Sequence, residues 1–496
     1  MDDAHPPIDR ITKRINSIGC GNSQLTTFLV ATFMLLCDGQ EMLVMSLVNL
    51  RLKSLWHLSP AAEGTLGSCV FAGVLIGSVL SGAAADIYGR RRALLVFLTI
   101  LAVAGLLSAV APTFPWLIAI RTIAGIGLGG TIPTTNCLIS EVVPDRSRAT
   151  VMLSVGVGFT LGECLTALQA MALDLNNGNN WRWLLAWSAF PAFAALIVSL
   201  FFLDESPRYL QASGKIKEAK ALLNKMADQN ERPWCCCCCN GRTEREEETS
   251  RPTDEDHNDG DADDTSALLV QDQHTKALDD SSPATAPGSG SCCRPMVELF
   301  AVARPLDTIM VWIIFMVASS VFYGLVWVFP LTLAEGGGNE NNSGVSSKVL
   351  FGALAELPSI LIPILFIDWL GRKGTLTLSF VVCIPIAVAC AVFSPHLRKE
   401  VESAAYFWSV MGLKCMISVS FNVIYVYAAE YVPSKVRGFA VGMGSAASRI
   451  GGIVTPYAMV LFHRSHIASP YWFMVVACVV GLVASCVMQE VGKHMR

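Results

Sequence analysis

The sequence predicts an all-α membrane protein whose twelve transmembrane helices form two six-helix halves. Three observations support this fold class. The chain is 53% hydrophobic and only 15% charged, it holds twelve apolar segments of bilayer length, and two loop motifs recur in both halves. A cytosolic enzyme would not carry repeated lipid-length apolar runs, and a nucleic-acid-binding protein would need a basic stripe on a polar surface. Both classes are excluded.

The twelve predicted helices are separated by polar breaks, and each spans about 20 mostly apolar residues. They cover residues 25–48, 64–86, 93–111, 115–139, 149–172, 183–203, 307–332, 348–369, 375–394, 404–428, 438–461 and 470–489. The polar residues 1–23 lead into a span too long for a signal-peptide core, so we expect no cleaved signal. With both termini in the cytosol, the cytosolic side carries nine Lys and Arg in short loops and five in the tails, and the opposite side carries seven. Because positive residues favour the cytosolic side, this excess predicts cytosolic termini.

An acidic segment separates the two halves. Residues 241–280 hold 14 acidic and 4 basic side chains, a composition that cannot bury enough apolar surface to fold. The predicted organisation is a cytosolic tail (1–23), the first half with a following cytosolic helix (24–230), a disordered cytosolic linker (231–304), the second half (305–490) and a cytosolic tail (491–496).

The linker carries candidate modification and sorting signals. Cysteines flank it at Cys235, Cys236, Cys237, Cys238, Cys239, Cys292 and Cys293. Juxtamembrane cysteines are typical sites of palmitoylation, although a tolerated low-complexity insertion explains them equally well, and metal binding is less favoured because histidine spacing is missing. Asp264, Leu268 and Leu269 form an acidic dileucine pattern, which predicts contact with sorting adaptors. The expected location is therefore either the plasma membrane or, if this signal is used, an endosomal or vesicle membrane. Asn341 begins a glycosylation sequon.

Two loop motifs occur twice. Glu141-x-x-Pro-x-x-x-Arg148 recurs as Glu430-x-x-Pro-x-x-x-Arg437, an offset of 430 − 141 = 289 residues. Asp86-x-x-Gly89-Arg90-Arg91 recurs as Asp368-x-x-Gly371-Arg372-Lys373, an offset of 368 − 86 = 282 residues. Two motif pairs in the same order and at nearly the same displacement indicate a duplicated six-helix unit.

We expect these motifs to form a gate at the cytosolic mouth. Ion pairs that form in only one state bias a two-state rocking equilibrium, which produces alternating access. The expected pairs join Asp86 and Arg90 to Glu430 or Arg437, and Asp368 and Arg372 to Glu141 and Arg148. The competing interpretation is topology alone, because basic clusters also hold loops in the cytosol.

Six charged residues inside the predicted spans are candidates for function, because each costs about 2.5–3.5 kcal/mol on insertion scales. They are Asp38, Glu41, Arg121, Glu163, Glu356 and Lys414. Such residues face a cavity or a charged partner, so all six are candidates for substrate or proton contact, with a purely structural ion pair as the alternative.

Asp38 and Glu41 are three residues apart and therefore share one face of their helix. Two neighbouring carboxylates do not both ionise easily, so one is expected to hold a proton near neutral pH, which suits a proton symporter. Arg121 is the expected counter-ion, and protonation of a carboxylate would release it toward an anionic substrate. The alternative is a static brace between the first and fourth helices.

Glu356 precedes Pro358, and proline inside a span is tolerated where it lines a cavity. Lys414 is then either the partner of Glu356 or a counter-charge for the substrate. Aromatic pairs at helical spacing, Tyr323 with Trp327 and Phe421 with Tyr425, predict stacking on a planar ring or an organic cation. Ordinary packing is the alternative interpretation.

Several motifs together resemble the major facilitator superfamily. They are Gly82-x-x-x-Asp86-x-x-Gly89-Arg90-Arg91-Arg92, Arg121-x-x-x-Gly125-x-Gly127-x-Gly129-Gly130 and Asp204-Glu205-Ser206-Pro207-Arg208. Within that superfamily the chain resembles the branch of synaptic vesicle 2-related proteins and nicotinate transporters. The residues that carry this second resemblance are Asp38-x-x-Glu41-Met42, Trp181-Arg182-Trp183, Phe322-Tyr323-Gly324, Glu356-Leu357-Pro358 and Arg449-x-Gly451.

The resemblance implies a secondary active transporter that moves a small ionisable organic solute by alternating access. It implies a nicotinate-like carboxylate as substrate, or another organic ion, with Arg121 as counter-ion and the proton as coupling ion. A sugar is the alternative substrate, and a non-transporting vesicle scaffold is the alternative function. We expect no cofactor, metal site, enzymatic activity or nucleic-acid partner, and a monomer in the lipid bilayer.

Overall fold

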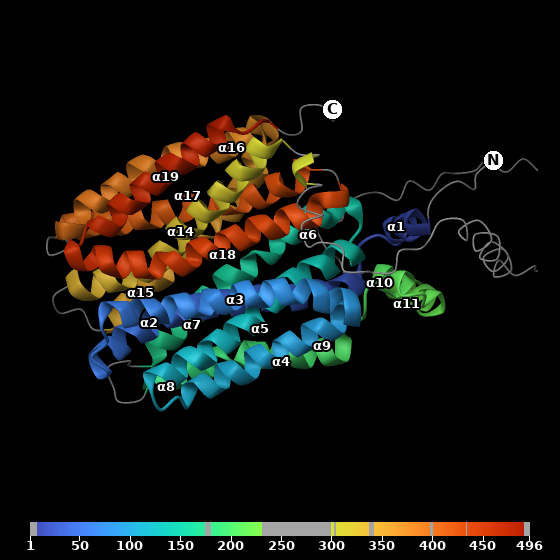
Figure 1. The fold of residues 1–496 in the computed structure, drawn as a ribbon, viewed down its shortest axis with the longest axis horizontal. Helices are drawn as coiled ribbons and strands as arrows, with labels where there is room; N and C mark the ends of the chain where they lie inside the picture. Colours follow the sequence, from blue (N-terminus) through green and yellow to red (C-terminus); the bar gives the residue numbers. More distant parts are fainter. Residues whose placement is uncertain are drawn as a thin grey trace, which may run out of the picture. The chain divides into compact units, whose positions relative to one another are not determined.

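The computed structural model describes residues 7–173, 180–230, 299–301, 304–336, 342–396, 400–432 and 434–490. All regular elements in these residues are helices (Figure 1), so the predicted all-α fold is confirmed. The flanking cysteines of the linker, the dileucine pattern and Asn341 lie outside the described residues, as does almost all of the predicted linker. Those expectations stay predictions.

The first half contains six spans followed by two short helices. Its elements are α1 (Pro7–Ile18), α2 (Asn22–Leu55), α3 (Pro60–Tyr88), α4 (Arg90–Ala109), α5 (Phe114–Val142), α6 (Asp145–Val155), α7 (Val157–Ala172), α8 (Asn180–Ser188), α9 (Phe190–Phe202), α10 (Pro207–Ala212) and α11 (Ile216–Asn230). The second half repeats the spans with α14 (Pro305–Gly336), α15 (Asn342–Leu354), α16 (Pro358–Phe393), η1 (Ser394–His396), α17 (Glu400–Glu430), α18 (Ser434–Ser465) and α19 (Ser469–Val487).

Within the described residues, ten segments are long and apolar enough to cross a membrane, judged by length and composition. The remaining two predicted spans correspond to α6 with α7 and to α18. α6 and α7 are separate helices of 11 and 16 residues, each shorter than the roughly 20 residues of a membrane span, and α18 contains Arg449. All twelve predicted segments are nevertheless largely helical in the described residues.

Two spans are interrupted near charged residues. Gly156 separates α6 from α7, and a turn over residues 355–357 separates α15 from α16. Glu356 lies in that turn, two residues before Pro358, where the sequence predicted a kink. Broken helices in membranes occur where the released backbone groups line a polar interior, so we expect this turn to face the polar interior of the bundle.

Close helix contacts in the first half depend on small residues. A Cβ atom added at Gly39 of α2 would lie 2.1 Å from the carbonyl oxygen of Phe159, and one at Gly162 of α7 would lie 2.0 Å from that of Leu36. Glycine lets two helix backbones approach closely. The resulting van der Waals contacts hold the helices together in lipid, where no hydrophobic driving force acts between them. The same rule holds α3 against α5.

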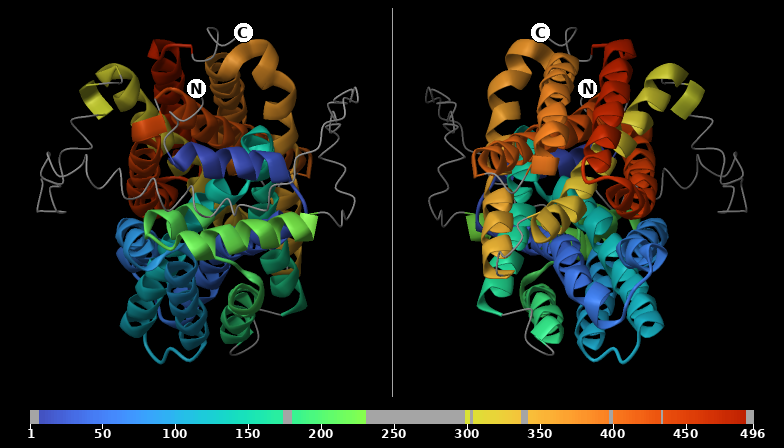
Figure 2. Two further views of the ribbon diagram at one scale, coloured as in Figure 1. Left: turned by 90° about the vertical axis from the view of Figure 1, so that its right-hand side faces the viewer. Right: turned by 90° about the vertical axis from the view of Figure 1, so that its left-hand side faces the viewer.

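One end of the bundle carries three short helices. We call this end, with α1, α10 and α11, the inner end, because the sequence predicts it to be cytosolic, and we call the opposite end the outer end. Figure 2 shows α1 and α11 side by side across the inner end. Part of the predicted polar tail, residues 1–23, thus forms the helix α1. Ile15 of α1 belongs to the same apolar cluster as Leu223 and Met226 of α11, and this packing stabilises the helix.

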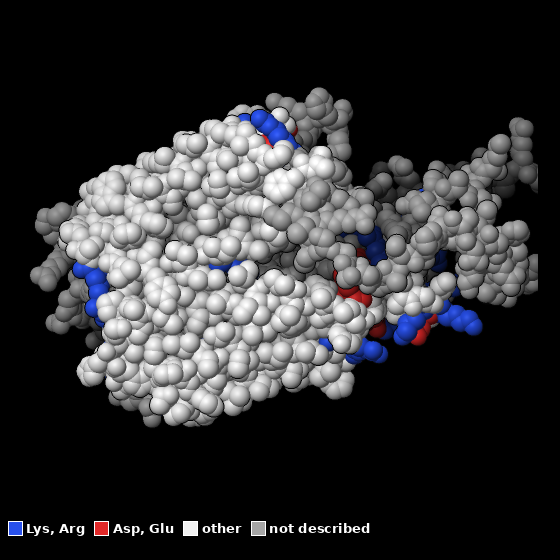
Figure 3. All heavy atoms as spheres, in the orientation of Figure 1, with Lys and Arg blue, Asp and Glu red and all other residues white. Residues whose placement is uncertain are grey.

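Asn230, at the end of α11, connects the short helices of the inner end to α2, the first span. Its side-chain amide donates to the carbonyl of Gly19 and to Gln24, and its oxygen accepts from the backbone and hydroxyl of Ser23. Along the flank seen in Figure 3, charged side chains are almost missing and gather at the two ends. This distribution is the one expected of a protein surrounded by lipid.

The two halves meet in the middle and at the outer end. The Ser68 hydroxyl of α3 donates to the Ile453 carbonyl of α18 at 2.6 Å, and Thr65 lies 2.6 Å from the Tyr457 hydroxyl. Arg464 forms a 2.8 Å ion pair with Glu63, which is fully buried. These contacts close the outer end between the halves.

Candidate functional site

The centre of the described bundle holds a charged cluster that bridges the two halves. Lys414 of α17 forms ion pairs with Glu163 of α7 and, at 2.7 Å, with Glu356 in the broken span. The Thr160 hydroxyl of α7 donates to Glu356 at 3.4 Å. Because Glu163 belongs to the first half and Glu356 to the second, one ammonium group ties the two halves together.

A second buried ion pair lies within the first half. Arg121 of α5 donates to Glu41 of α2, and both side chains are almost completely buried. Arg121 is thus a counter-ion of the predicted carboxylate pair, through Glu41. Asp38, also buried, leaves its Oδ1 atom without a hydrogen-bond partner.

Arg449 of α18 is a central residue that the sequence analysis used only for the family resemblance. Its guanidinium donates to the Tyr323 hydroxyl at 3.1 Å and interacts electrostatically with Asp38. The signal was available, because an arginine inside an apolar span is a functional candidate by default.

Aromatic rings lie beside both charged groups. The Phe322 ring lies 6.0 Å from the Lys414 ammonium and 5.3 Å from the Tyr323 ring. Phe421 stacks on Phe322 at 6.1 Å and contacts Tyr425 at 5.4 Å, while the predicted stacking on a substrate stays a prediction.

Tyr323 and Trp327, the predicted pair on α14, contact different neighbours. Within the described residues the Tyr323 ring contacts Phe71 and Phe322. Trp327 is directed toward the outer contact between the halves, where a Cβ atom on Gly67 would lie 3.0 Å from its ring. A spacing of four residues places two rings on one helix face, but the neighbouring helices decide what each ring touches.

The duplicated loop motifs build matching structures at the inner end. In the first half, Arg90 pairs with Glu141 at 3.1 Å and with Asp86 at 3.3 Å. The Arg91 backbone N–H donates to Glu205 at 3.0 Å, and the Arg91 guanidinium donates to the Leu200 carbonyl at 2.8 Å.

The second half repeats these contacts. Arg372 pairs with Glu430 at 2.8 Å, and Lys373 donates to the Cys486 carbonyl at 2.9 Å. The glycine in each motif has a positive φ, 96° at Gly89 and 80° at Gly371. A Cβ atom added at Gly89 would collide with Glu205, and one added at Gly371 would collide with Glu490. The internal repeat therefore extends to individual side-chain contacts.

These pairs lie within each half. Arg90 and Arg372 were expected to reach across to the other half in one state, and in this structure each pairs with a glutamate of its own half, so the cross-half gate stays a prediction. The physical reason is adjacency, since the motif arginine and its glutamate lie on neighbouring helices of one repeat. Arg148 donates to the Val143 carbonyl at 3.5 Å. The side chains of Asp368 and Arg437 lie outside the described residues.

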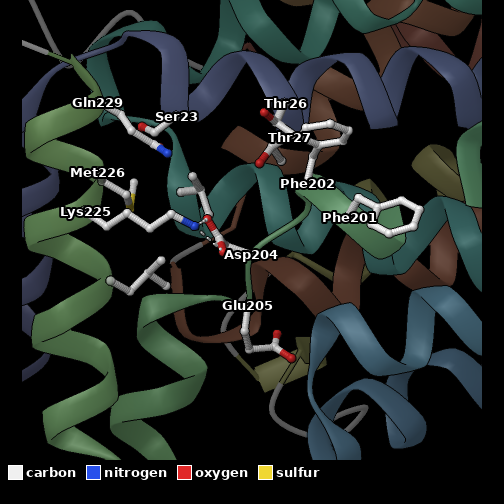
Figure 4. A pocket seen from close by; sticks show the side chains of 12 residues that line it. Ser23, Thr26, Thr27, Phe201, Phe202, Asp204, Glu205, Lys225, Met226 and Gln229 are labelled. Carbon is white, nitrogen blue, oxygen red and sulfur yellow. Dashed lines mark hydrogen bonds and ion pairs between the residues drawn. The ribbon is translucent and has the colours of Figure 1, made fainter. Parts of the chain in front are cut away.

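A separate cavity opens at the inner end, between the start of α2, the end of α9 and α11 (Figure 4). Ser23 and Thr27 line one wall, and Asp204 pairs with Lys225 at 2.7 Å on the other. The cavity does not include the central charges. Among the described residues, no group of three or more His, Cys, Asp or Glu side chains is arranged to hold a metal ion.

Comparison with known proteins agrees with this architecture. Residues 29–456 match a family model described as Major Facilitator Superfamily. An organic cation/carnitine transporter 7 of Arabidopsis thaliana is 30% identical, over 92% of this chain and 89% of that protein. The synaptic vesicle 2-related protein of Xenopus laevis is 26% identical, over 95% and 79% of the two chains. The niacin transporter NiaP of Acinetobacter baylyi is 24% identical, over 96% of each.

Among solved structures, the partially occluded inward open conformation of the xylose transporter XylE from E. coli aligns with a TM-score of 0.67. The alignment covers 94% of this chain and 98% of that chain at 17% identity. At this identity the likeness shows the fold alone.

Proposed function

We propose that this chain, which belongs to the major facilitator superfamily and is a multi-pass membrane transporter, moves a small ionisable organic solute in symport with protons. The family is one of transporters rather than enzymes. The observation that carries the proposal is the Glu163–Lys414–Glu356 cluster, a set of ionisable groups shared between the two halves. A transporter whose halves rock about such a cluster changes its contacts when a proton or a charged solute arrives.

The proton is the proposed coupling ion because buried carboxylates outnumber their cations. Asp38 has an unpartnered oxygen and lies near Arg449, so protonation of Asp38 releases the guanidinium. A ligand that changes the pairing of a buried charge has different affinities for the two states, which is the requirement for coupling.

An organic ion is favoured over a sugar by the chemistry of the centre. Buried charged groups and aromatic rings surround it, whereas a neutral sugar is recognised by uncharged hydrogen-bonding groups. Relatives named as niacin and organic cation transporters point the same way. The within-half pairs at Arg90 and Arg372 are proposed to keep each inner loop rigid, so that each half moves as one body.

The test is uptake of labelled nicotinate, sugars and organic cations into proteoliposomes, with and without an inward acid gradient. We expect gradient-stimulated uptake of an organic ion that Asp38→Asn and Glu356→Gln each abolish. Glu218→Gln, on the exposed surface of α11, is the matched control and should transport normally. Uptake of sugars alone would support the sugar alternative. Folded protein that transports none of these solutes would support a scaffold.

A further inference from the structure

The cavity at the inner end lies apart from the central charges, so the proposed transport step makes no use of it (Figure 4). Its walls come mainly from the start of α2, from the end of α9 with the residues that follow it, and from α11. Its volume is about 140 Å³. A cavity of about 150 Å³ holds a molecule as large as benzene, so this one has room for a small polar group.

Two hydroxyl groups of α2 line the cavity and have no hydrogen-bond partner among the described residues. They belong to Thr26 and Thr27, and Thr27 is only 6% exposed. Figure 4 shows Thr27 on the side of α2 that faces the pair of Asp204 and Lys225. Because a buried hydroxyl without a partner costs free energy, this wall indicates a polar ligand.

The start of α2 makes this wall suitable for an anionic group. α2 begins at Asn22, so Ser23, Thr26 and Thr27 lie in its first two turns. The N-terminal end of a helix carries a partial positive charge, which favours groups such as phosphate. The helix end and the hydroxyl donors therefore favour the same kind of ligand atom, a phosphate oxygen.

The opposite wall carries more negative than positive charge. Asp204 and Glu205 line the cavity there, and the cation beside them is Lys225, which pairs with Asp204 at 2.7 Å. Glu205 accepts hydrogen bonds from the backbone N–H groups of Arg91 and Ser206. The Asp204 side chain is 44% exposed and is accessible to a ligand. An ammonium group at Asp204 would balance the charge of this wall, whereas a second anion would be repelled.

The cavity lies at the end of a membrane span, beside two exposed aromatic rings. The span Asn180–Phe202 ends there, and Phe201 and Phe202 line the cavity while they are 78% and 66% exposed. Aromatic rings at the end of a span lie at the level of the lipid headgroups. A small group that combines a phosphate with an ammonium, at this level of the membrane, is a phospholipid headgroup.

We propose that the inner-end cavity binds the headgroup of phosphatidylethanolamine, with its phosphate at Thr26 and Thr27 and its ammonium at Asp204. The acyl chains then lie beside Phe201 and Phe202. A choline headgroup fits less well, because its quaternary nitrogen has no N–H to donate and its methyl groups need more room. The bound headgroup joins α2 to the residues that follow α9, so it stabilises the inner end without taking part in solute transport.

Four lipids with identical acyl chains test the role of the ammonium. They are phosphatidylethanolamine, its N-methyl and N,N-dimethyl derivatives, and phosphatidylcholine. Binding to the full chain in detergent is measured by native mass spectrometry. Phosphatidylethanolamine should bind about tenfold more tightly than phosphatidylcholine, with the derivatives in between, because a charge-assisted hydrogen bond is worth at least that much. Glycerophosphoethanolamine, the same headgroup without acyl chains, should bind more weakly than the lipid by at least about tenfold.

Variants separate the two ends of the headgroup. Asp204→Asn should reduce the preference for phosphatidylethanolamine over phosphatidylcholine to less than about threefold. Thr27→Val should weaken binding of both lipids alike, by about fivefold, because both carry the phosphate. The valine keeps the shape of the side chain and removes a hydroxyl without a partner, so the unfolding midpoint of the lipid-free protein should not fall. Thr99→Val, on the exposed face of α4, is the control and should bind both lipids like the wild type.

Three results would overturn the proposal. One is equal affinity of the wild-type protein for phosphatidylethanolamine and phosphatidylcholine, and another is tighter binding of the anionic phosphatidylglycerol. The third is equal affinity for the lipid and for glycerophosphoethanolamine, which would identify the ligand as a soluble phosphate ester. Wild-type affinity of Thr27→Val for both lipids would remove the phosphate from this wall and contradict the proposed position of the headgroup. None of these measurements uses solute uptake, so their outcome leaves the proposed transport function to its own test.

Discussion

Removal of the shared ammonium is the sharpest perturbation that the structure offers. In Lys414→Met, a side chain of similar length keeps the volume and leaves Glu163 and Glu356 facing each other. Both carboxylates bind one nitrogen, so their nearest oxygens lie within roughly 5 Å. At an effective dielectric constant of about 20, Coulomb's law gives about 3 kcal/mol of repulsion. This value agrees with the ~3–5 kcal/mol usual for breaking a buried pair.

The destabilisation should depend on pH. The repulsion needs both carboxylates to be charged, so the loss should be larger at alkaline pH than at acidic pH. The assay is the thermal unfolding midpoint of the purified protein in detergent at both pH values. The control is the triple variant Lys414→Met, Glu163→Gln and Glu356→Gln, which has no buried charge left there.

We expect the single variant to unfold several degrees below the wild type at alkaline pH and the triple variant to recover most of that loss. A pH-independent loss would refute the reasoning, because a packing defect alone does not titrate. Equal midpoints for the single and triple variants would refute it as well, since they would show that the carboxylates do not repel one another.

Two further perturbations act at the ends of the bundle. Gly89→Ala should lower stability by about 2–4 kcal/mol, because its φ of 96° is strained for alanine and the new Cβ atom would lie 2.5 Å from Glu205. Gly82→Ala, where nothing lies within 4 Å, should leave the unfolding midpoint unchanged, and equal losses in both would contradict this account. Glu63→Gln breaks the ion pair with Arg464 at the outer end. Because the Arg464 side chain is partly exposed, the free energy of unfolding should fall by at most about 1 kcal/mol. Spin labels on the outer ends of α3 and α18 should show a larger open population, and an unchanged distance distribution would argue against an outer gate.

The fold was predictable to a large degree because its causes are local. Lipid requires each span to satisfy its own backbone hydrogen bonds, so an apolar run of bilayer length becomes a helix whatever surrounds it. The duplicated motifs likewise predicted two matching halves, and Gly89 and Gly371 adopt the same positive-φ turn. Hydropathy was least informative for α18, whose Arg449 and other polar side chains are masked from lipid by neighbouring helices.

The pairing of charges was not predictable, because it depends on which helices are adjacent. The sequence identified Glu163, Glu356 and Lys414 as buried charges but left their partners open. Only the packing of α7 and α17 against the broken span brings all three together. The within-half pair of Arg90 with Glu141 was likewise left open by the sequence, because it depends on the packing of α4 against α5.

By itself, the sequence determined that this chain is a twelve-helix membrane protein of duplicated design with ionisable groups in its interior. Those properties follow from composition, periodicity and local backbone requirements, which need no knowledge of neighbours. The tertiary structure decided that Arg449 faces Asp38 and Tyr323, and that one lysine joins the two halves. The strength of a buried charge interaction depends on distance and on what excludes water, and both are set only when helices distant in sequence pack together.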